Sequence, residues 1–352
     1  MRLAELRVEN FRNLAAVELV PAAGINVIFG SNASGKTSLL EAIHFLARVR
    51  SFRPTRPQQL IRHGSDALTV RAVLAESQTR LAVRRSHERT EVRIDQQDVR
   101  SLSVLARHLP LQVVNTESQR LLLDGPQVRR SFLDWGVFHV EHSFYEHWRR
   151  YDRALRQRNR ALRSGDARLA RSWEPELESQ AAAVTEQRRH YVAALEALAR
   201  PLLSRWLPSE AVSFEYRSGW PGGRSLQEAF DNGRSREIDA GHTLYGPHRA
   251  DLLIRSNGYD AQHRLSRGQQ KLLAIALLLA ASQVMHEHGE ALLLIDDLPA
   301  ELDAQKRDEV IEVLLDTGAQ AFVTTTDPAA VPIPSGSGKW FHVEHGHYRE
   351  VV

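Results

Sequence analysis

The sequence predicts an α/β protein with a mixed sheet, an antiparallel β meander and an inserted α-helical lobe. Three observations support this fold class. The β-branched run 25–29 ends at Gly30 and is followed by a helical pattern. Residues 67–99 alternate apolar and polar side chains, as in a meander with one buried face. Residues 126–210 carry the apolar spacing of long helices. We therefore expect a discontinuous α/β lobe (residues 1–125 and 211–352) and an inserted helical lobe (residues 126–210).

Composition limits the classes of function. The 352 residues are 42% apolar and 25% charged, which is ordinary for a soluble protein with enough chain for two cores. No apolar run reaches the roughly eighteen residues of a membrane span, and the N-terminus lacks the apolar block of a signal peptide. We therefore expect a cytoplasmic protein that has no membrane partner. The absence of cysteine excludes disulfides, thiol catalysis and cysteine-based metal sites.

The residues after the first buried strand match the pattern G-x-x-x-x-G-K-[ST]. Its glycines let backbone N–H groups and the N-terminus of the following helix face phosphate oxygens. Lys36 would reach the β- and γ-phosphates, and the Thr37 hydroxyl would hold Mg²⁺. We therefore expect ATP and Mg²⁺ as cofactors. The expected nucleotide-binding residues are Gly30, Ser31, Asn32, Ala33, Ser34, Gly35, Lys36, Thr37 and Ser38.

The flanking segments offer weaker candidates. Residues 1–29 have the pattern of strands joined by turns, and Arg12 follows the first of them. Arg12 either contacts the nucleotide or is an exposed arginine at a strand end. The arginine-rich loop 48–57 contacts ATP, contacts DNA or is simply solvated. Gln112, in the expected core strand 109–115, is a candidate for a glutamine that senses Mg²⁺.

The predicted helical lobe contains two long helices joined by a turn, so these helices should be antiparallel. The first has an apolar stripe and, about 100° around the helix, a stripe of arginines. Asp152 is the only acid between residues 149 and 163, and arginines on one face repel each other unless an anion lies against them. We therefore favour a DNA-backbone surface over a solvated face. Its residues are Arg149, Arg153, Arg156, Arg160 and Arg163.

A second candidate anion site follows the helical lobe, after the expected loops 219–224 and 231–236. Ser266, Gly268 and Gln269 lie at the start of the apolar helix 272–282, where N–H groups lack partners within the helix. On its own, Ser266 would favour an ordinary helix cap, because serine is very common at this position.

The apolar strand 291–295 ends in two carboxylates, which is the Walker B form. Asp296 would belong to the Mg²⁺ shell, and Asp297 would orient or deprotonate the attacking water. Residues 300–303 follow at the spacing of a D-loop and add Asp303 to the nucleotide site. A third strand, 320–327, ends in hydroxyls, among which we expect Thr326 to sense the γ-phosphate.

With these motifs, the chain resembles the RecF family of bacterial DNA repair ATPases, which belongs to the SMC-like branch of ABC-type ATPases. The segments that carry the resemblance are 6–13, 30–37, 126–135, 246–252, 265–271 and 294–303.

The resemblance implies an ABC-type head that hydrolyses ATP weakly, dependent on DNA, and forms an ATP-dependent homodimer. Ser266 of one protomer would cap the γ-phosphate bound by the other. It also implies binding to single-stranded and gapped DNA, with RecO and RecR as partners in loading RecA. Two positions depart from the broader ABC pattern, since Asp297 replaces a glutamate and Thr326 replaces the switch histidine.

Two other classes of function share some of these motifs. One is the ATPase subunit of a transporter, and the other is a DNA-binding clamp with negligible ATP turnover. The arginine stripe, in place of a surface for docking to a membrane domain, and the N-terminal segment 10–13 favour the SMC-like branch.

Overall fold

The computed structural model describes residues 2–287, 291–298, 302–334 and 336–351. The chain forms two compact units, Met1–Ser118 with Ala281–Val352 (unit 1) and Gln119–Ala280 (unit 2). This division differs from the predicted lobes, because strands after residue 210 pack on the long helices of unit 2 and so belong to that unit. Among the described helices, none is long and apolar enough to cross a membrane.

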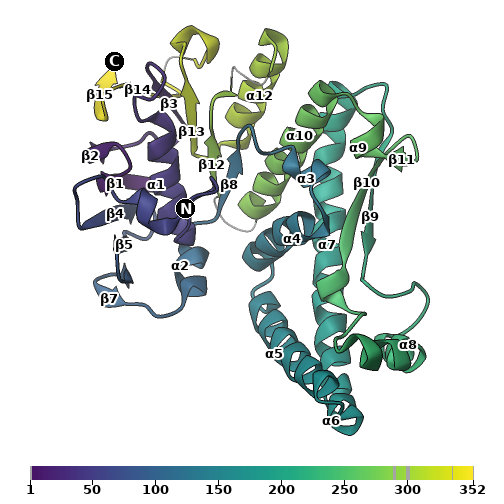
Figure 1. The fold of residues 1–352 in the computed structure, drawn as a ribbon. Helices are drawn as coiled ribbons and strands as arrows, with labels where there is room; N and C mark the ends of the chain where they lie inside the picture. The colour runs from purple at the N-terminus through teal and green to yellow at the C-terminus, as the bar shows by residue number, and fades with distance from the viewer. Residues whose placement is uncertain (1, 288–290, 299–301, 335, 352) are drawn as a thin grey trace. The chain divides into compact units, whose positions relative to one another are not determined.

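Unit 1 contains two six-stranded sheets (Figure 1). The first is antiparallel, in the order β2-β1-β4-β5-β6-β7, and includes the predicted meander. The second has the order β15-β14-β3-β13-β12-β8 and is parallel except for β15. The strands of the first sheet are β1 (Leu3–Phe11), β2 (Leu14–Leu19), β4 (Ala67–Leu74), β5 (Arg80–Ser86), β6 (Thr90–Ile94) and β7 (Gln97–Asp98). Those of the second are β3 (Ile25–Phe29), β8 (Leu111–Val114), β12 (Leu292–Ile295), β13 (Ala321–Thr325), β14 (Gly338–Glu344) and β15 (His347–Val351).

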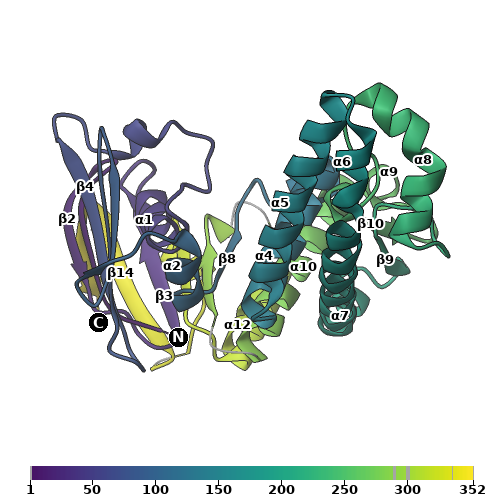
Figure 2. The ribbon, with the colours of Figure 1, turned by 90° about the horizontal axis from the view of Figure 1, so that it is seen from below.

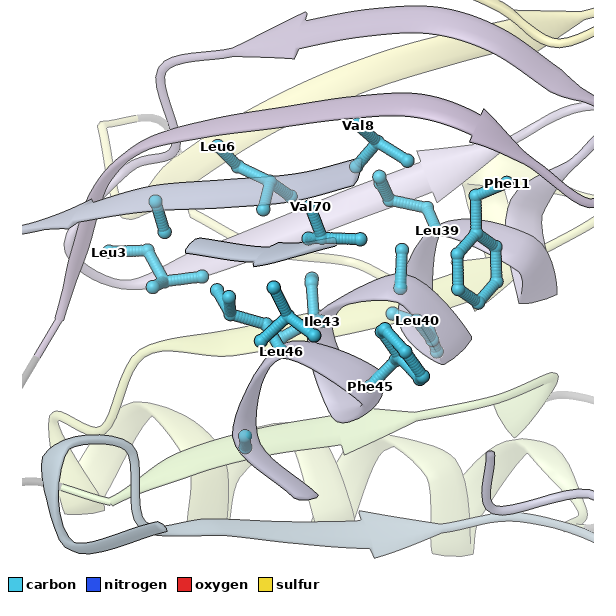
Figure 3. Close-up of a cluster of buried hydrophobic side chains, with 14 of the residues drawn as sticks. Leu3, Leu6, Val8, Phe11, Leu39, Leu40, Ile43, Phe45, Leu46 and Val70 are labelled. Atoms are coloured by element: carbon cyan, nitrogen blue, oxygen red, sulfur yellow. The ribbon is translucent and has the colours of Figure 1, made fainter. Parts of the chain in front are cut away.

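Helix α1 (Lys36–Arg48) lies between the two sheets of unit 1 (Figure 2). Its apolar side chains, including Leu39 and Ile43, pack with Leu6 and Val70 of the antiparallel sheet (Figure 3). The same cluster includes Phe322 of the mixed sheet, so the helix is apolar on more than one side. Burial on both sides fixes the position of its N-terminus. The other helices of unit 1 are η1 (Pro57–Leu60), α2 (Leu102–His108), α12 (Ala304–Thr317) and η3 (Pro328–Ala330).

Unit 2 is mainly helical. The long helices α5 (Phe144–Arg163) and α7 (Glu174–Trp206) run side by side, as predicted (Figures 1 and 2). A three-stranded sheet in the order β11-β10-β9 packs on α4 and α7. The strands are β9 (Val212–Arg217), β10 (Asp251–Ser256) and β11 (Tyr259–Asp260). The remaining helices are α3 (Arg120–Leu123), α4 (Pro126–Val140), α6 (Ala167–Ser172), α8 (Leu226–Ala240), η2 (Pro247–Arg249), α9 (Ala261–Arg264) and α10 (Arg267–Glu287), which continues into unit 1.

Helix α8 includes residues 231–236, so the expected loop at this position is wrong. Ser225 and Glu228 form a reciprocal capping box that starts the helix. Gly233, within this helix, is required by packing, since a Cβ there would lie 2.4 Å from the Tyr245 ring. A glycine in this helix therefore marks close packing and not a turn.

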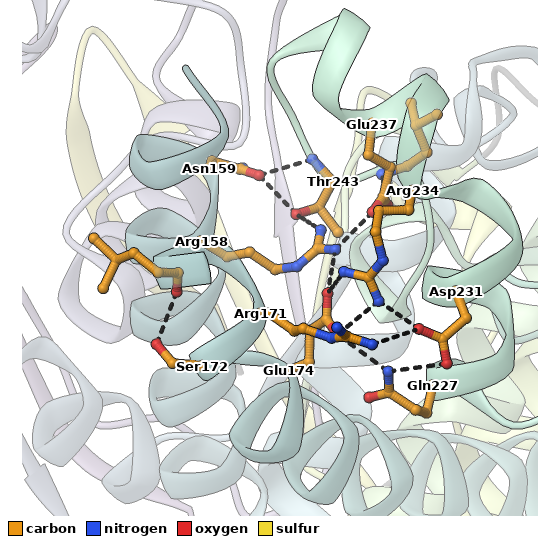
Figure 4. Close-up of polar contacts among 12 residues, drawn as sticks. Arg158, Asn159, Arg171, Ser172, Glu174, Gln227, Asp231, Arg234, Glu237 and Thr243 are labelled. Carbon is orange, nitrogen blue, oxygen red and sulfur yellow. Dashed lines mark hydrogen bonds and ion pairs between the residues drawn. The ribbon is translucent and has the colours of Figure 1, made fainter. Parts of the chain in front are cut away.

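A buried ion network joins α5, α7 and α8 (Figure 4). The Arg158 guanidinium donates to Glu174 at 2.9 Å and to Glu237 at 2.7 Å, and all three side chains are at most 1% exposed. It also donates to the Thr243 hydroxyl at 2.9 Å and lies 4.2 Å from the centre of the Phe230 ring. This arginine is therefore a structural residue, unlike the arginines of the predicted stripe on the same helix.

Replacing Arg158 with methionine should lower the free energy of unfolding by about 3–5 kcal/mol, because Glu237 would remain buried without its cation. Arg153→Met, at an exposed position on the same helix, is the matched control and should change it by about 0.5 kcal/mol or less. Urea unfolding followed by circular dichroism measures both variants. Equal losses would show that the network does not stabilise unit 2.

Candidate nucleotide-binding site

The loop between β3 and α1 needs both of the glycines in its sequence pattern. A Cβ at Gly30 would lie 2.2 Å from the carbonyl oxygen of Val343, on the neighbouring strand β14. Gly35 has a φ of +123°, and a Cβ there would lie 2.9 Å from Leu14. The loop therefore fits closely against its surroundings and delivers the chain directly into the N-terminus of α1.

Lys36 is buried at the first position of α1. Its Nζ donates to the carbonyl oxygens of Gly30 at 2.8 Å and Ser31 at 2.9 Å. Burial lowers the pKa of Lys36, and the charges of Asp297 and Asp296 oppose this shift. The loop carbonyls thus hold a cation at the place where the sequence predicts phosphate.

Asp296 follows β12 and lies against α1 and β13. Its Oδ1 accepts from the Thr37 hydroxyl at 2.9 Å and from the Thr324 hydroxyl at 2.8 Å. Burial raises the pKa of Asp296, whereas these two hydrogen bonds act to lower it. The structure therefore brings together Asp296 and Thr37, the two residues that the sequence assigns to the Mg²⁺ shell. These carboxylate and hydroxyl oxygens are the ligand types that Mg²⁺ prefers.

Thr324 is a site residue that the sequence analysis missed. Besides donating to Asp296, its hydroxyl accepts the backbone N–H of Asp297 at 2.7 Å, and Asp297 has a φ of +57°. The parallel pairing of Ile295 with Val323 brings these residues together. Thr326, the expected phosphate sensor, is exposed and follows the end of β13. The signal that would have identified Thr324 is this strand register.

The structure does not bring Gln112 to the carboxyl end of the sheet. Gln112 pairs with Leu293, three residues before Asp296, which corresponds to about 10 Å along a strand. Asp303 caps α12 and accepts the backbone N–H of Lys306 at 2.9 Å. Residues 300 and 301 of the predicted D-loop lie outside the described residues.

Arg12 contacts a buried carboxylate on α1, the helix that follows the phosphate loop. Its guanidinium pairs with Glu41 of α1 at 2.8 Å, and the Glu41 side chain is fully buried. Arg53, from the arginine-rich loop, pairs with the same carboxylate at 2.9 Å, and the Ser51 hydroxyl also donates to it. At least these two arginines therefore balance an internal charge.

In unit 2, Ser266 and Gln269 form a reciprocal cap at the start of α10. The backbone N–H of Gln269 donates to the Ser266 hydroxyl at 3.3 Å, and that of Ser266 donates to Oε1 of Gln269 at 2.9 Å. A Cβ at Gly268 would have open space around it within 4 Å. This cap is compatible with an ordinary helix start and with the predicted anion site.

The predicted arginine stripe is exposed on α5. Arg156 pairs with Asp152 at 2.9 Å, and this exposed pair contributes little stability. The side chains of the other four have no hydrogen bond or ion pair among the described residues. They are Arg149, Arg153, Arg160 and Arg163.

Comparisons with known proteins agree on one family. The family described as the RecF/RecN/SMC N-terminal domain matches residues 2–344. The DNA replication and repair protein RecF of Shewanella baltica (strain OS155) is 44% identical, with 98% of each chain covered. The RecF of Shewanella oneidensis is 41% identical, again with 98% of each chain covered.

Two solved structures share the fold. The structure of the recombination mediator protein RecF with ATP has a TM-score of 0.87 at 25% identity, covering 99% of this chain and 97% of that one. An Smc head bound to the C-terminal winged-helix domain of ScpA has a TM-score of 0.62 at 14% identity, covering 100% and 97%. The second likeness concerns the fold alone.

The structure and the sequence pattern select different threonines, so substitution can distinguish them. Thr324→Val should reduce Mg²⁺-ATP hydrolysis about tenfold or more, because it removes a donor to Asp296 and an acceptor for the Asp297 amide. Thr324→Ser should retain most of the activity, and Thr326→Val should have the smaller effect. Steady-state phosphate release measures all three. A larger loss in Thr326→Val would favour the residue that the sequence pattern selects.

Proposed function

Since this chain belongs to the RecF family of DNA replication and repair proteins, we propose that it is an ATP-dependent DNA-binding ATPase of recombinational repair. One observation carries the ATPase part of the proposal. It is the contact of Asp296 with both Thr37 and Thr324, next to a loop whose carbonyls hold Lys36. Side-chain hydrogen bonds thus join the first turn of α1, which follows the phosphate loop, to the end of the Walker B strand β12 and to strand β13.

The proposed chemistry assigns a separate task to each side chain. Lys36 leaves the loop carbonyls and binds phosphate oxygens, which are stronger acceptors because they are charged. Thr37 and Asp296 would hold Mg²⁺, which would supply positive charge to the phosphate chain. Asp297 orients the attacking water. Its side chain is one methylene shorter than the usual glutamate, which is consistent with weak hydrolysis.

We further propose that ATP links two copies of the chain. In this arrangement the Ser266 end of α10 from one protomer caps the γ-phosphate bound by the other, as the family resemblance implies. ADP lacks that phosphate, so only ATP stabilises the dimer through a difference in affinity. Hydrolysis would then release the two protomers.

The proposed DNA surface is the exposed arginine stripe of α5. Phosphate contacts of this kind give affinity without sequence preference, which suits binding to single-stranded and gapped DNA. RecO and RecR are the proposed protein partners, in a role that helps to load RecA. The family membership supports this function over the ATPase subunit of a transporter.

The nucleotide dependence of dimerisation tests the central proposal. Lys36→Ala should abolish ATP binding and leave a monomer, whereas Asp297→Asn should bind ATP and accumulate as a dimer, because it retains the site but not the carboxylate that acts on the attacking water. Sedimentation velocity with ATP, ADP and no nucleotide measures both, and Lys306→Ala, on α12, controls for loss of a lysine. A wild-type mass that is the same in all three conditions contradicts the proposal.

The arginine stripe predicts a salt-dependent effect on DNA affinity. The test variant changes four arginines of the stripe to glutamine, namely Arg149, Arg153, Arg160 and Arg163. The slope of log affinity against log salt should become shallower by about 0.9 for each duplex phosphate that the variant no longer binds. Fluorescence anisotropy with a short gapped duplex measures the slope. The control changes four exposed arginines of unit 2 that already have carboxylate partners, and its slope should equal that of the wild type. They are Arg120, Arg171, Arg200 and Arg217.

A DNA-binding clamp with negligible turnover remains the competing interpretation. It shares ATP binding and dimerisation with the ATPase and differs only in product formation. Phosphate release by the wild type, with and without gapped DNA, separates the two when Asp297→Asn serves as the blank. Wild-type release equal to that blank in both conditions would favour the clamp.

A further inference from the structure

The outer side of the phosphate loop is held by residues from two distant parts of the chain. Three consecutive carbonyls of the loop accept hydrogen bonds. Asn13 Nδ2 donates to Ala33 at 3.2 Å, and the Gly346 backbone N–H donates to Ser34 at 2.8 Å. The Tyr348 hydroxyl donates to Gly35 at 2.8 Å. Gly346 and Tyr348 belong to the turn and second strand of the C-terminal hairpin β14–β15.

The groups that donate these three hydrogen bonds are themselves held in place. The Ser38 hydroxyl donates to Oδ1 of Asn13 at 2.7 Å, which leaves the Asn13 amide free to face the loop. Gly346 has a φ of +79°, and a Cβ there would lie 2.8 Å from the Asn13 carbonyl oxygen. Burial raises the pKa of Tyr348, so its hydroxyl stays protonated and remains a donor across the working pH range.

The direction of these carbonyls matters because a peptide group is planar and trans. When a carbonyl oxygen points to one side, the N–H of the next residue points to the opposite side. The hairpin bonds to the Ser34 and Gly35 carbonyls, the second of which also accepts the Leu39 N–H at 3.1 Å, therefore turn the N–H groups of Gly35 and Lys36 away from the hairpin. Successive N–H groups that face one point form a site for an anion.

We propose that the C-terminal hairpin is part of the nucleotide site, with Tyr348 and Asn13 as positioning residues that pre-orient the loop amides for the phosphate chain. This inference rests on the proposed ATP binding. Neither side chain need touch the nucleotide, since each acts through the backbone of the loop. A pre-oriented loop gains affinity because less ordering is left to occur on binding.

Tyr348→Phe tests the proposal, because it removes only the hydroxyl. The loss of one hydrogen bond should weaken Mg²⁺-ATP binding about two- to tenfold. Inorganic triphosphate should lose affinity by the same factor, since the loop amides act on the phosphates and not on the base. Titration calorimetry of the full chain measures both probes. Tyr259→Phe, at a side chain that is 70% exposed, is the matched control and should match the wild type.

The outcomes separate this inference from the proposed function. Wild-type ATP affinity in Tyr348→Phe, whatever its thermal midpoint, overturns the positioning role while the ATPase proposal stands. A loss for ATP but not for triphosphate also overturns it. If the wild type itself does not bind ATP and Lys36→Ala behaves like it, the proposed function fails instead. Asn13→Ala provides a second variant and should weaken binding of both probes in the same way.

Discussion

A buried cation that follows β3 and a partly buried carboxylate that follows β12, on either side of β13 in the sheet, constrain the whole candidate site. Burial shifts the pKa of Lys36 downwards and that of Asp296 upwards, so each charge is only partly compensated by its surroundings. Loop carbonyls solvate the first, and two hydroxyls solvate the second. A polyphosphate with a divalent cation supplies the charges that complement both groups. The geometry of the site is thus a consequence of electrostatics in a poorly solvated place.

The rest of unit 1 keeps these groups in position. The helix that begins at Lys36 is clamped between two sheets, so its N-terminus cannot shift without disturbing a core that includes Leu39 and Phe322. On the outer side, the C-terminal hairpin bonds to the loop that precedes the helix. Segments near the beginning and at the end of the chain therefore converge on one loop. Such convergence explains why distant residues, such as Tyr348, belong to the same functional unit.

Patterns confined to one element were predictable from the sequence, and relations between elements were not. The phosphate loop, the buried strand before Asp296 and the two long antiparallel helices follow from local periodicity, and the comparisons confirm the RecF family. The choice between Thr324 and Thr326 depends on the pairing of two parallel strands, which periodicity does not encode. Arg158 lies within an arginine-rich helix, and only its partners Glu174 and Glu237 distinguish it from its exposed neighbours. Likewise, no sequence pattern indicates that the C-terminal hairpin contacts the phosphate loop.

Some glycines of the chain are required by their surroundings within one chain, and Gly268 is not. Gly35 and Gly346 are required by nearby atoms and by positive φ, and Gly233 by the ring of Tyr245. Gly268, near the start of α10, has open space where its Cβ would be, and its φ does not demand glycine. Glycine in a helix interior costs about 1 kcal/mol relative to alanine, and although the cost is smaller in the first turn, no described neighbour of Gly268 requires glycine there. The close approach of a second molecule to this helix end provides one, because a backbone without a side chain lets an anion reach the N–H groups. The proposed ATP-linked dimer supplies that molecule.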